Sequence, residues 1–266
     1  MRIFQTLALV GYSAVRRSGL TSTRPGAAVF VFLYNLYKEV FEGREVARLC
    51  GLVEPGTVVI DVGANIGFFT VRLARRVGDL GKVIAFEPES CNFLRLRAAV
   101  ARAGLTKRVE LVQAAVAEAT GQVTLVLNPD NPADHRLGEG GVPVIARCLD
   151  DELSRRGWPP VSLVKIDVQG AESRVLAGAG EMLDRLRPAL FLEVDIATSG
   201  DEGRGIVSLL HSLQARGYAG YRLASSKLEG PLSIDAVIEI AKRRGYADFL
   251  FLGDGDTRAP APRQGE

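Results

Sequence analysis

The sequence predicts an α/β domain in which a largely parallel sheet lies between helices. From residue 56 onward, short runs rich in β-branched residues alternate with stretches of helical periodicity. The first run, Thr57–Val62, is rich in apolar residues, as expected for a strand that is buried on both faces. A chain of 266 residues can hold one large domain or two small ones.

The expected elements follow one another regularly. After the first strand, Ile66, Phe69, Leu73 and Val77 recur at three- and four-residue spacing, which predicts a helix. Further strands are expected at Lys82–Phe86, Val109–Gln113, Val161–Ile166, Ala189–Val194, Tyr218–Leu223 and Asp248–Leu252. Further helices are expected at Ser90–Ala103, Ala171–Leu186, Glu202–Arg216 and Ile234–Arg244.

One stretch interrupts this alternation. Gln122–Leu127 and Val142–Cys148 have the character of extended segments, and a polar loop rich in Pro and Gly joins them. The simplest interpretation is an antiparallel hairpin inserted where a crossover helix would otherwise lie. Because long loops in compact domains often carry function, we expect this one to face the substrate.

The two ends of the chain differ from the middle. We expect an N-terminal helical extension over residues 1–50, one domain over residues 51–253 and a disordered tail over residues 254–266. The longest apolar run, Gly26–Leu36, is roughly half of the ~20 residues that a bilayer requires. The N-terminal segment is therefore expected to cap the domain, with peripheral membrane contact as the alternative.

Composition narrows the classes of function. Lys and Arg total 33 against 31 Asp and Glu, so the formal charge is only +2, which argues against a charge-driven partner such as nucleic acid. The three cysteines, Cys50, Cys91 and Cys148, are far apart and odd in number, which argues against a disulfide framework or a zinc site. We expect three small buried thiols in a reducing, cytoplasmic compartment.

The most informative stretch is VVIDVGANIGFFT, Val58–Thr70. A buried strand carries Asp61 to its carboxyl end, where ligands collect in open α/β sheets, and Gly63 and Gly67 flank a tight turn into a helix. Asn65 stands at a position that requires tolerance of the left-handed conformation. Unlike the dinucleotide motif G-x-G-x-x-G, this loop begins with an acid that would repel phosphate and favour a cationic ligand.

A second acid stands at the end of the next strand. Glu87, in FEPES, follows Gly67 by twenty residues, a spacing at which a carboxylate can accept hydrogen bonds from both hydroxyls of an adenosine ribose. The loop and this acid together predict a nucleoside site, whereas either feature alone would be weak.

These motifs resemble those of the FkbM-type S-adenosylmethionine-dependent methyltransferases. The resemblance extends over residues 40–253 through VVIDVGANIGFFT, FEPES, LVKIDVQGAESRVLAGA, FLEVD and DFLFL. It implies a class I methyltransferase fold, which is a Rossmann-like sheet of seven strands, mostly parallel, with helices on both faces and the last strand antiparallel. It also implies O-methylation of a hydroxyl on a sugar, a glycan or glycolipid, or a natural product.

The resemblance assigns the cofactor site residue by residue. Asp61, Gly63, Asn65 and Gly67 would surround the methionine part of S-adenosylmethionine, and Glu87 would hold its ribose. The segment around Ala115 would lie near the adenine. The sequence departs from the family at Gln169, where Glu is frequent, so a catalytic role of that position is in doubt.

Methyl transfer to a hydroxyl needs a group that accepts its proton. Asp167 ends its strand at the same sheet edge as Asp61 and is a candidate for this group. Its alternative role is to cap the next helix. Lys165, two residues earlier on the strand, is expected to pair with it. His135 in the long loop and Glu193 on the following strand are the other candidates. We predict no metal, since no spacing of ligands requires one.

Two alternative functions stay open at this point. One is a nicotinamide-dependent oxidoreductase with a variant nucleotide loop, and the other is a non-catalytic binding module that has kept the fold. The acid before the glycines of the loop argues against the first.

Overall fold

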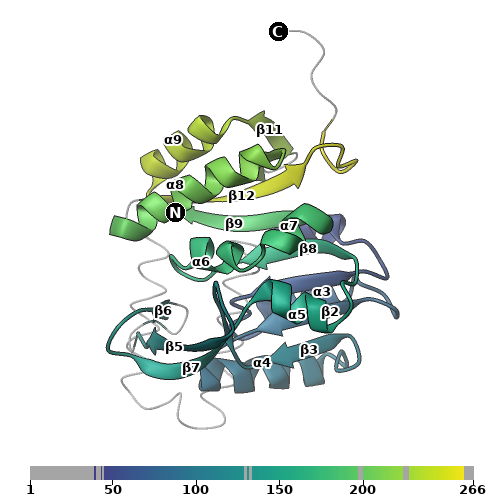
Figure 1. Ribbon diagram of the computed structural model, residues 1–266. Coiled ribbons are helices and arrows are strands. Elements are labelled where there is room, and N and C mark those ends of the chain that lie inside the picture. Colours follow the sequence, from purple (N-terminus) through teal and green to yellow (C-terminus); the bar gives the residue numbers. More distant parts are fainter. Residues whose placement is uncertain are drawn as a thin grey trace.

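The computed structural model describes residues 39, 43, 45–128, 131, 134–196, 200–223 and 228–260 (Figure 1). Most of the expected N-terminal extension, with its membrane contact, and the last six residues lie outside these ranges. Within them, none of the helices combines the length and the apolar character needed to cross a bilayer.

The main sheet has eight strands in the order β11-β10-β12-β9-β8-β1-β2-β3. Their bounds are β1 Val58–Val62, β2 Lys82–Phe86, β3 Val109–Val112, β8 Val161–Ile166, β9 Ala189–Asp195, β10 Tyr218–Leu223, β11 Leu228–Leu232 and β12 Tyr246–Gly253. Strands β3, β2, β1, β8 and β9 run parallel to one another, and β12 runs antiparallel to both β9 and β10.

The predicted count of seven strands is wrong. Leu228–Leu232 pairs antiparallel with β10 and extends the sheet at that edge. Its sequence, LEGPL, contains Gly and Pro, which are typical of turns, so neither propensity nor alternation indicated a strand.

Helices cover both faces of this sheet (Figure 1). They are α3 Phe68–Ala74, α4 Ser90–Arg102, α5 Leu149–Arg155, α6 Glu172–Ala177, α7 Gly180–Arg185, α8 Gly200–Ala215 and α9 Ile234–Arg244. Two core clusters follow from the alternation of side chains along β1: Ile60 faces the helices α5 to α9, and Val59 faces α3, α4 and the helical residues 45–52.

Two expectations about the helices need correction. The helix expected at Ala171–Leu186 is divided into α6 and α7 by Gly178, where a Cβ would lie 2.5 Å from the carbonyl oxygen of Ala117. Helix α5 was not expected at all. Residues 45–52 are helical, and Leu49 among them is fully buried, so this segment packs against the domain. The domain boundary at residue 51 stays a prediction.

A second, small sheet lies beside the main one. It contains β4 Ala115–Val116, β5 Gly121–Val126, β6 Arg136–Leu137 and β7 Val142–Arg147, in the order β4-β7-β5-β6. Strands β5 and β7 pair antiparallel, but they form the middle of a four-stranded sheet and not an isolated hairpin. Because β4 follows closely on β3, this sheet continues from the carboxyl edge of the main sheet.

The described part of the tail is packed against the domain. Arg258 donates hydrogen bonds from Nη1 to the carbonyl oxygens of Leu52 (3.0 Å) and Ser162 (2.9 Å), and it pairs with Asp256. The expectation of disorder is therefore wrong for residues 254–260, because one guanidinium joins the tail to two distant segments.

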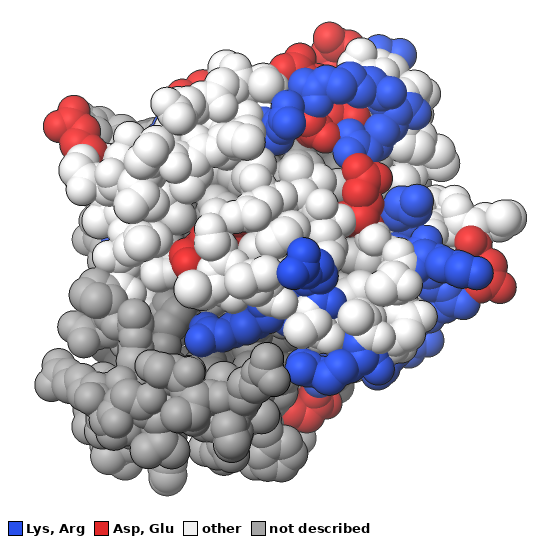
Figure 2. All heavy atoms as spheres, turned by 90° about the horizontal axis from the view of Figure 1, so that it is seen from below, with Lys and Arg blue, Asp and Glu red and all other residues white. Residues whose placement is uncertain are grey.

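The thiols and the surface charges complete this description. All three cysteines are free, but Cys91 is exposed on α4, against the expectation that each would be buried. On the face that contains α4 in Figure 1, basic side chains are the more prominent, and acidic ones are scattered among them and along the margins (Figure 2). Ion pairs among the described residues include Arg156–Glu110 and Arg108–Asp79.

Candidate active site at the carboxyl edge of the sheet

The loop after β1 is held in a sharply turned conformation. Its amides at Gly63 and Ala64 both donate to the carbonyl oxygen of Phe86, at 3.1 and 2.9 Å, which ties the loop to the end of β2. Three of its residues have positive φ: Gly63 (74°), Asn65 (49°) and Gly67 (92°). The expectation that Asn65 takes a left-handed conformation is confirmed.

The two glycines of this loop are required by protein neighbours. A Cβ on Gly63 would lie 2.0 Å from the carbonyl oxygen of Asp167, at the end of β8. A Cβ on Gly67 would lie 2.8 Å from Leu96 Cδ1 on α4. The glycines therefore allow the end of β8 and helix α4 to approach the loop closely, and their contact with a cofactor stays a prediction.

Asp61 is fully buried and does not face solvent. Its Oδ2 accepts a hydrogen bond from Thr70 Oγ1 at 2.6 Å. Its Oδ1 lies 3.2 Å from Lys165 Nζ, close enough for an ion pair but without hydrogen-bond geometry. The carboxylate is thus neutralised inside the protein, where it holds the loop, instead of facing a cationic ligand as the sequence suggested.

Lys165 joins the two halves of this edge. Its side chain is 2% exposed. Besides the contact with Asp61, Nζ donates to the carbonyl oxygen of Gly63 at 3.2 Å and lies 3.7 Å from Asp167 Oδ2. The ammonium also lies 4.9 Å from the centre of the Phe69 ring. The expected pairing of Lys165 with Asp167 is confirmed, and the sequence did not indicate its contact with the loop.

Glu87 lies at the end of β2, and its side chain is turned into the same edge. Oε2 accepts from the amide of Asn65 at 2.8 Å and Oε1 from the amide of Glu89 at 3.0 Å. Burial raises the pKa of Glu87 to about 7, although both amides lower it. Each oxygen accepts one of these bonds, so the carboxylate keeps capacity for the hydroxyls of a ligand.

The segment expected near the adenine runs past Glu87 into the small sheet. The amide of Glu87 donates to the carbonyl oxygen of Val112, and Gln113 Nε2 donates to Ser90 Oγ at 3.0 Å. Ala115 itself is buried in the small sheet, where it pairs with Ala146 on β7. Gln113 thus contacts the start of the helix that follows Glu87, whereas Ala115 belongs to the small sheet. The role of Ala115 stays a prediction.

A group of carboxyl side chains lies beyond the ends of β8 and β9. Asp167 directly follows β8, and its side chain is 33% exposed. Gln169 has a positive φ of 50°, and its Nε2 lies 3.4 Å from both Asp167 Oδ1 and Glu193 Oε2. Asp248 on β12 stands opposite Glu193 in the antiparallel register. The structure therefore brings Asp167 and Glu193 together, as their strand positions predicted.

Burial raises the pKa of Glu193, and the charges of Asp167, Asp248 and Glu172 raise it further. Burial likewise raises the pKa of Glu172 to about 7, while its Oε1 accepts from the amides of Val168 and Gly170. Glu172 thus organises the loop after β8 in addition to lying at the start of α6. A protonated Glu193 can donate a hydrogen bond but cannot serve as a base.

Two residues of this group were not selected from the sequence. Asp248 was noted only as part of the final strand, and Gln169 only as a departure from the family. The signal for Asp248 would have been an acid at the start of an antiparallel strand, because that strand begins at the edge where its parallel neighbours end.

His135 lies in the small sheet, in the turn before β6. Its Nδ1 accepts from the amide of Asn128 at 3.1 Å, and Asn128 Nδ2 donates to Asp134 Oδ2 at 3.0 Å. These bonds organise the turn itself and leave Nε2 as the site of the proton in neutral His135. A catalytic role for His135 stays a prediction.

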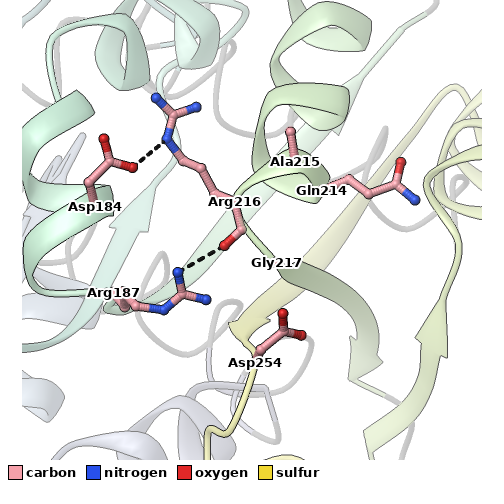
Figure 3. A pocket seen from close by; sticks show the side chains of 7 residues that line it. All are labelled: Asp184, Arg187, Gln214, Ala215, Arg216, Gly217 and Asp254. Atoms are coloured by element: carbon pink, nitrogen blue, oxygen red, sulfur yellow. Dashed lines mark hydrogen bonds and ion pairs between the residues drawn. The ribbon is translucent and has the colours of Figure 1, made fainter.

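A pocket of about 610 Å³ lies at the opposite edge of the main sheet (Figure 3). Three of the residues that line it are engaged with one another: Arg216 Nε donates to Asp184 Oδ1 at 2.9 Å, and Arg187 Nη1 donates to the carbonyl oxygen of Arg216 at 2.9 Å. It is bordered by the first residues of β10 and the end of β12, so it is separate from the carboxyl edge. Within the described residues, no group of three or more His, Cys, Asp or Glu is arranged to hold a metal ion.

The strand order, the antiparallel β12 and the turned loop after β1 together define a class I methyltransferase fold. The sequence profile described as "Methyltransferase FkbM domain" matches residues 61–223, and the chain belongs to this family. That membership argues against the nicotinamide-dependent oxidoreductase.

Three characterised relatives are similar in sequence. The AMB antimetabolite synthetase AmbE of Pseudomonas aeruginosa is 30% identical over 86% of this chain, which corresponds to only 12% of AmbE. The 31-O-demethyl-FK506 methyltransferase FkbM of Streptomyces tacrolimicus is 33% identical over 54% of the chain and 67% of that protein. The 2-O-methyltransferase NoeI of Sinorhizobium fredii is 29% identical over 51% of the chain and 63% of NoeI.

Solved structures support the fold. The O-methyltransferase TomG of Streptomyces achromogenes, crystallised in complex with S-adenosylmethionine, aligns with a TM-score of 0.50 at 17% identity, over 80% of either chain. At this identity the likeness concerns the fold alone.

Proposed function

We propose that the chain is an S-adenosylmethionine-dependent O-methyltransferase that acts on a hydroxyl of a sugar, a glycan or glycolipid, or a natural product. The observation that carries the proposal is Lys165, which contacts both the loop expected to hold the cofactor and Asp167, the candidate base. This double contact supports a cofactor site and a proton acceptor at the same edge of the sheet. The relatives FkbM and NoeI, both O-methyltransferases by name, support the choice of a hydroxyl.

The residues at this edge fit the proposed cofactor. Glu87 is buried, and two backbone amides orient its carboxylate. Each oxygen can still accept a hydrogen bond from a ribose hydroxyl. The loop with Gly63, Asn65 and Gly67 places backbone groups at the end of β1, where ligands bind in such sheets. Asp61 acts indirectly, because its charge pairs with Lys165 inside the protein.

The reaction requires little chemistry of the protein beyond orientation and acceptance of a proton. When bound, S-adenosylmethionine supplies a methyl group on a sulfonium, a leaving group that is already activated. Asp167 is the candidate that can accept the hydroxyl proton, because it is partly exposed and the Lys165 ammonium lies beside it. Glu193, whose pKa is raised, is suited to hold a hydroxyl oxygen by donating a hydrogen bond.

The acceptor is a small molecule or a glycan in this proposal, with no nucleic acid among the partners, and the compartment is the cytoplasm. The free thiols Cys50, Cys91 and Cys148 agree with a reducing compartment. Contact of the N-terminal segment with a membrane stays a prediction, since residues 1–38 lie outside the described residues.

Calorimetry with S-adenosylhomocysteine tests the cofactor assignment. We expect wild-type protein to bind, and Glu87→Gln to bind at least about tenfold more weakly because a charged acceptor is lost. Glu239→Gln, an exposed substitution on α9, is the control and should bind normally. Folded protein that binds no cofactor at millimolar concentration would overturn the proposal.

The activity is tested by transfer of a labelled methyl group to components of cell extracts. The labelled product is then identified by mass spectrometry. Asp167→Asn should keep cofactor binding and lose most of the transfer. If wild-type protein binds cofactor and labels no acceptor in any extract, the non-catalytic binding module becomes the better interpretation.

A further inference from the structure

Gln169 stands between two carboxyl groups of the candidate active site. It lies in the loop after β8 with a left-handed backbone, φ 50°, which directs its side chain back across the edge of the sheet. Its Nε2 carries two hydrogens and lies 3.4 Å from Asp167 Oδ1 and 3.4 Å from Glu193 Oε2. One amide can therefore donate to both carboxyl groups at once.

The surroundings of this pair are predominantly acidic. Asp248 faces Glu193 from β12, and Glu172 approaches from the start of α6. The ammonium of Lys165 lies beside Asp167, on the oxygen that Gln169 does not contact. Two adjacent carboxylates in such a place cannot both ionise without a large electrostatic cost, so one proton between them is the stable arrangement.

We infer that Gln169 is a positioning residue that holds Asp167 and Glu193 as an ionised and a protonated carboxyl group, and so makes Asp167 the acceptor of the substrate proton. The inference rests on the proposed function for its catalytic meaning. A Glu at position 169 would remove both donated bonds and add a third carboxyl group to the site.

The proton balance of the reaction follows from this arrangement. The hydroxyl oxygen of the acceptor forms a bond to the methyl carbon, the bond between carbon and sulfur breaks, and the sulfur leaves as a neutral thioether. The hydroxyl proton moves to Asp167 and from there to solvent, since Asp167 is partly exposed. Glu193 keeps its proton throughout and returns to the same state for the next turnover.

Carboxyl ¹³C NMR tests the inference on the intact chain, without a known acceptor. In protein labelled at Asp and Glu, with signals assigned through Asp167→Asn and Glu193→Gln, we expect the Glu193 carbon at its protonated position at pH 7. The Asp167 carbon is expected at its ionised position. Ionised Glu193 at pH 7 in wild-type protein would overturn the inference.

Two variants then test the amide itself. Gln169→Met keeps the size of the side chain but donates no bond, so the titration midpoint of Asp167 should rise by about one pH unit. Gln169→Glu should raise it further because of the added charge. Gln214→Met, at the opposite edge of the sheet, is the control and should change nothing. Unchanged midpoints in both Gln169 variants would refute the positioning role.

Binding of S-adenosylhomocysteine is measured on the same samples and separates the two proposals. If the midpoints shift as expected but wild-type protein binds no cofactor, the carboxyl pair stands and the methyltransferase proposal fails. If cofactor binds and the midpoints do not move, the methyltransferase proposal stands and the role of Gln169 fails. Once an acceptor is found, the acidic limb of the pH profile should move with the Asp167 midpoint.

Discussion

Replacing Lys165 by methionine would leave the Asp61 carboxylate in the core without a neighbouring ammonium. Both side chains are almost entirely excluded from solvent, with exposures of 2% for Lys165 and 0% for Asp61. Methionine matches the length and apolar character of the lysine chain and so avoids a large cavity. The variant therefore tests the charge and not the volume of the side chain.

The expected loss of stability follows from these contacts. Removal of one partner of a buried ion pair costs about 3–5 kcal/mol, because the remaining charge stays desolvated. The hydrogen bond to the carbonyl oxygen of Gly63 contributes about 1 kcal/mol more. We expect a total of about 4–6 kcal/mol, a large part of the roughly 5–15 kcal/mol typical of a folded domain. The double variant Asp61→Asn/Lys165→Met removes both charges and should recover a large part of this loss.

Urea unfolding followed by the fluorescence of Trp158, the single tryptophan of the chain, measures these free energies. Lys242→Met, at an exposed position on α9, is the matched control and should stay within about 0.5 kcal/mol of wild type. A loss below about 1 kcal/mol for Lys165→Met would refute the reasoning, and so would a double variant that is no more stable than the single one.

Three further predictions concern the loop, the tail and the pH dependence. In urea unfolding, Gly63→Ala should destabilise the fold by at least about 2 kcal/mol more than Gly104→Ala. Both glycines have a left-handed φ, but only at Gly63 would the added Cβ meet backbone atoms within 4 Å. Equal losses of stability would contradict this close approach. Arg258→Ala should lower the free energy of unfolding by about 1–3 kcal/mol, and an unchanged thermal midpoint would show that the tail contributes nothing. The pKa of Glu87 is raised from 4.5 to about 7, so its contribution to stability is fully present below pH 4.5 and is lost as pH rises through 7. Glu87→Gln should remove this pH-dependent loss. A free energy of unfolding that differs between the variant and wild type by the same amount from pH 4 to 8 would contradict the prediction.

The strands that carry the site were predictable because their signal is local. β1, β2, β8 and β9 are apolar runs followed by an acid or by glycines, and their predicted bounds agree with the structure to within one residue. β11 was missed because its Gly and Pro suit a turn, and its pairing with β10 depends on tertiary contact. The close approach of the Ala117 carbonyl oxygen to Gly178, where α6 ends, likewise joins segments that are far apart in the sequence.

The site itself was only partly predictable. The position of Asp61 and Glu87 at strand ends could be predicted, since parallel strands end at one edge. Their different environments could not be, because the partner of Asp61 is Lys165, more than a hundred residues away in the sequence. Gln169 has the same limitation, since its contact with Glu193 depends on the register between β8 and β9.

The contrast between the two strand-end acids follows from the alternation of the strands. Asp61 is the fourth residue of β1, one position before the strand ends, so its side chain is directed into the layer formed by α3 and its neighbours. Burial there requires an opposite charge, and Lys165, opposite Asp61 in the register between β1 and β8, supplies it. Glu87 follows the last residue of β2 and has left the pleat, so backbone amides of two loops orient it instead. The first acid is therefore suited to holding the architecture of the edge, and the second to receiving the hydroxyls of a ligand.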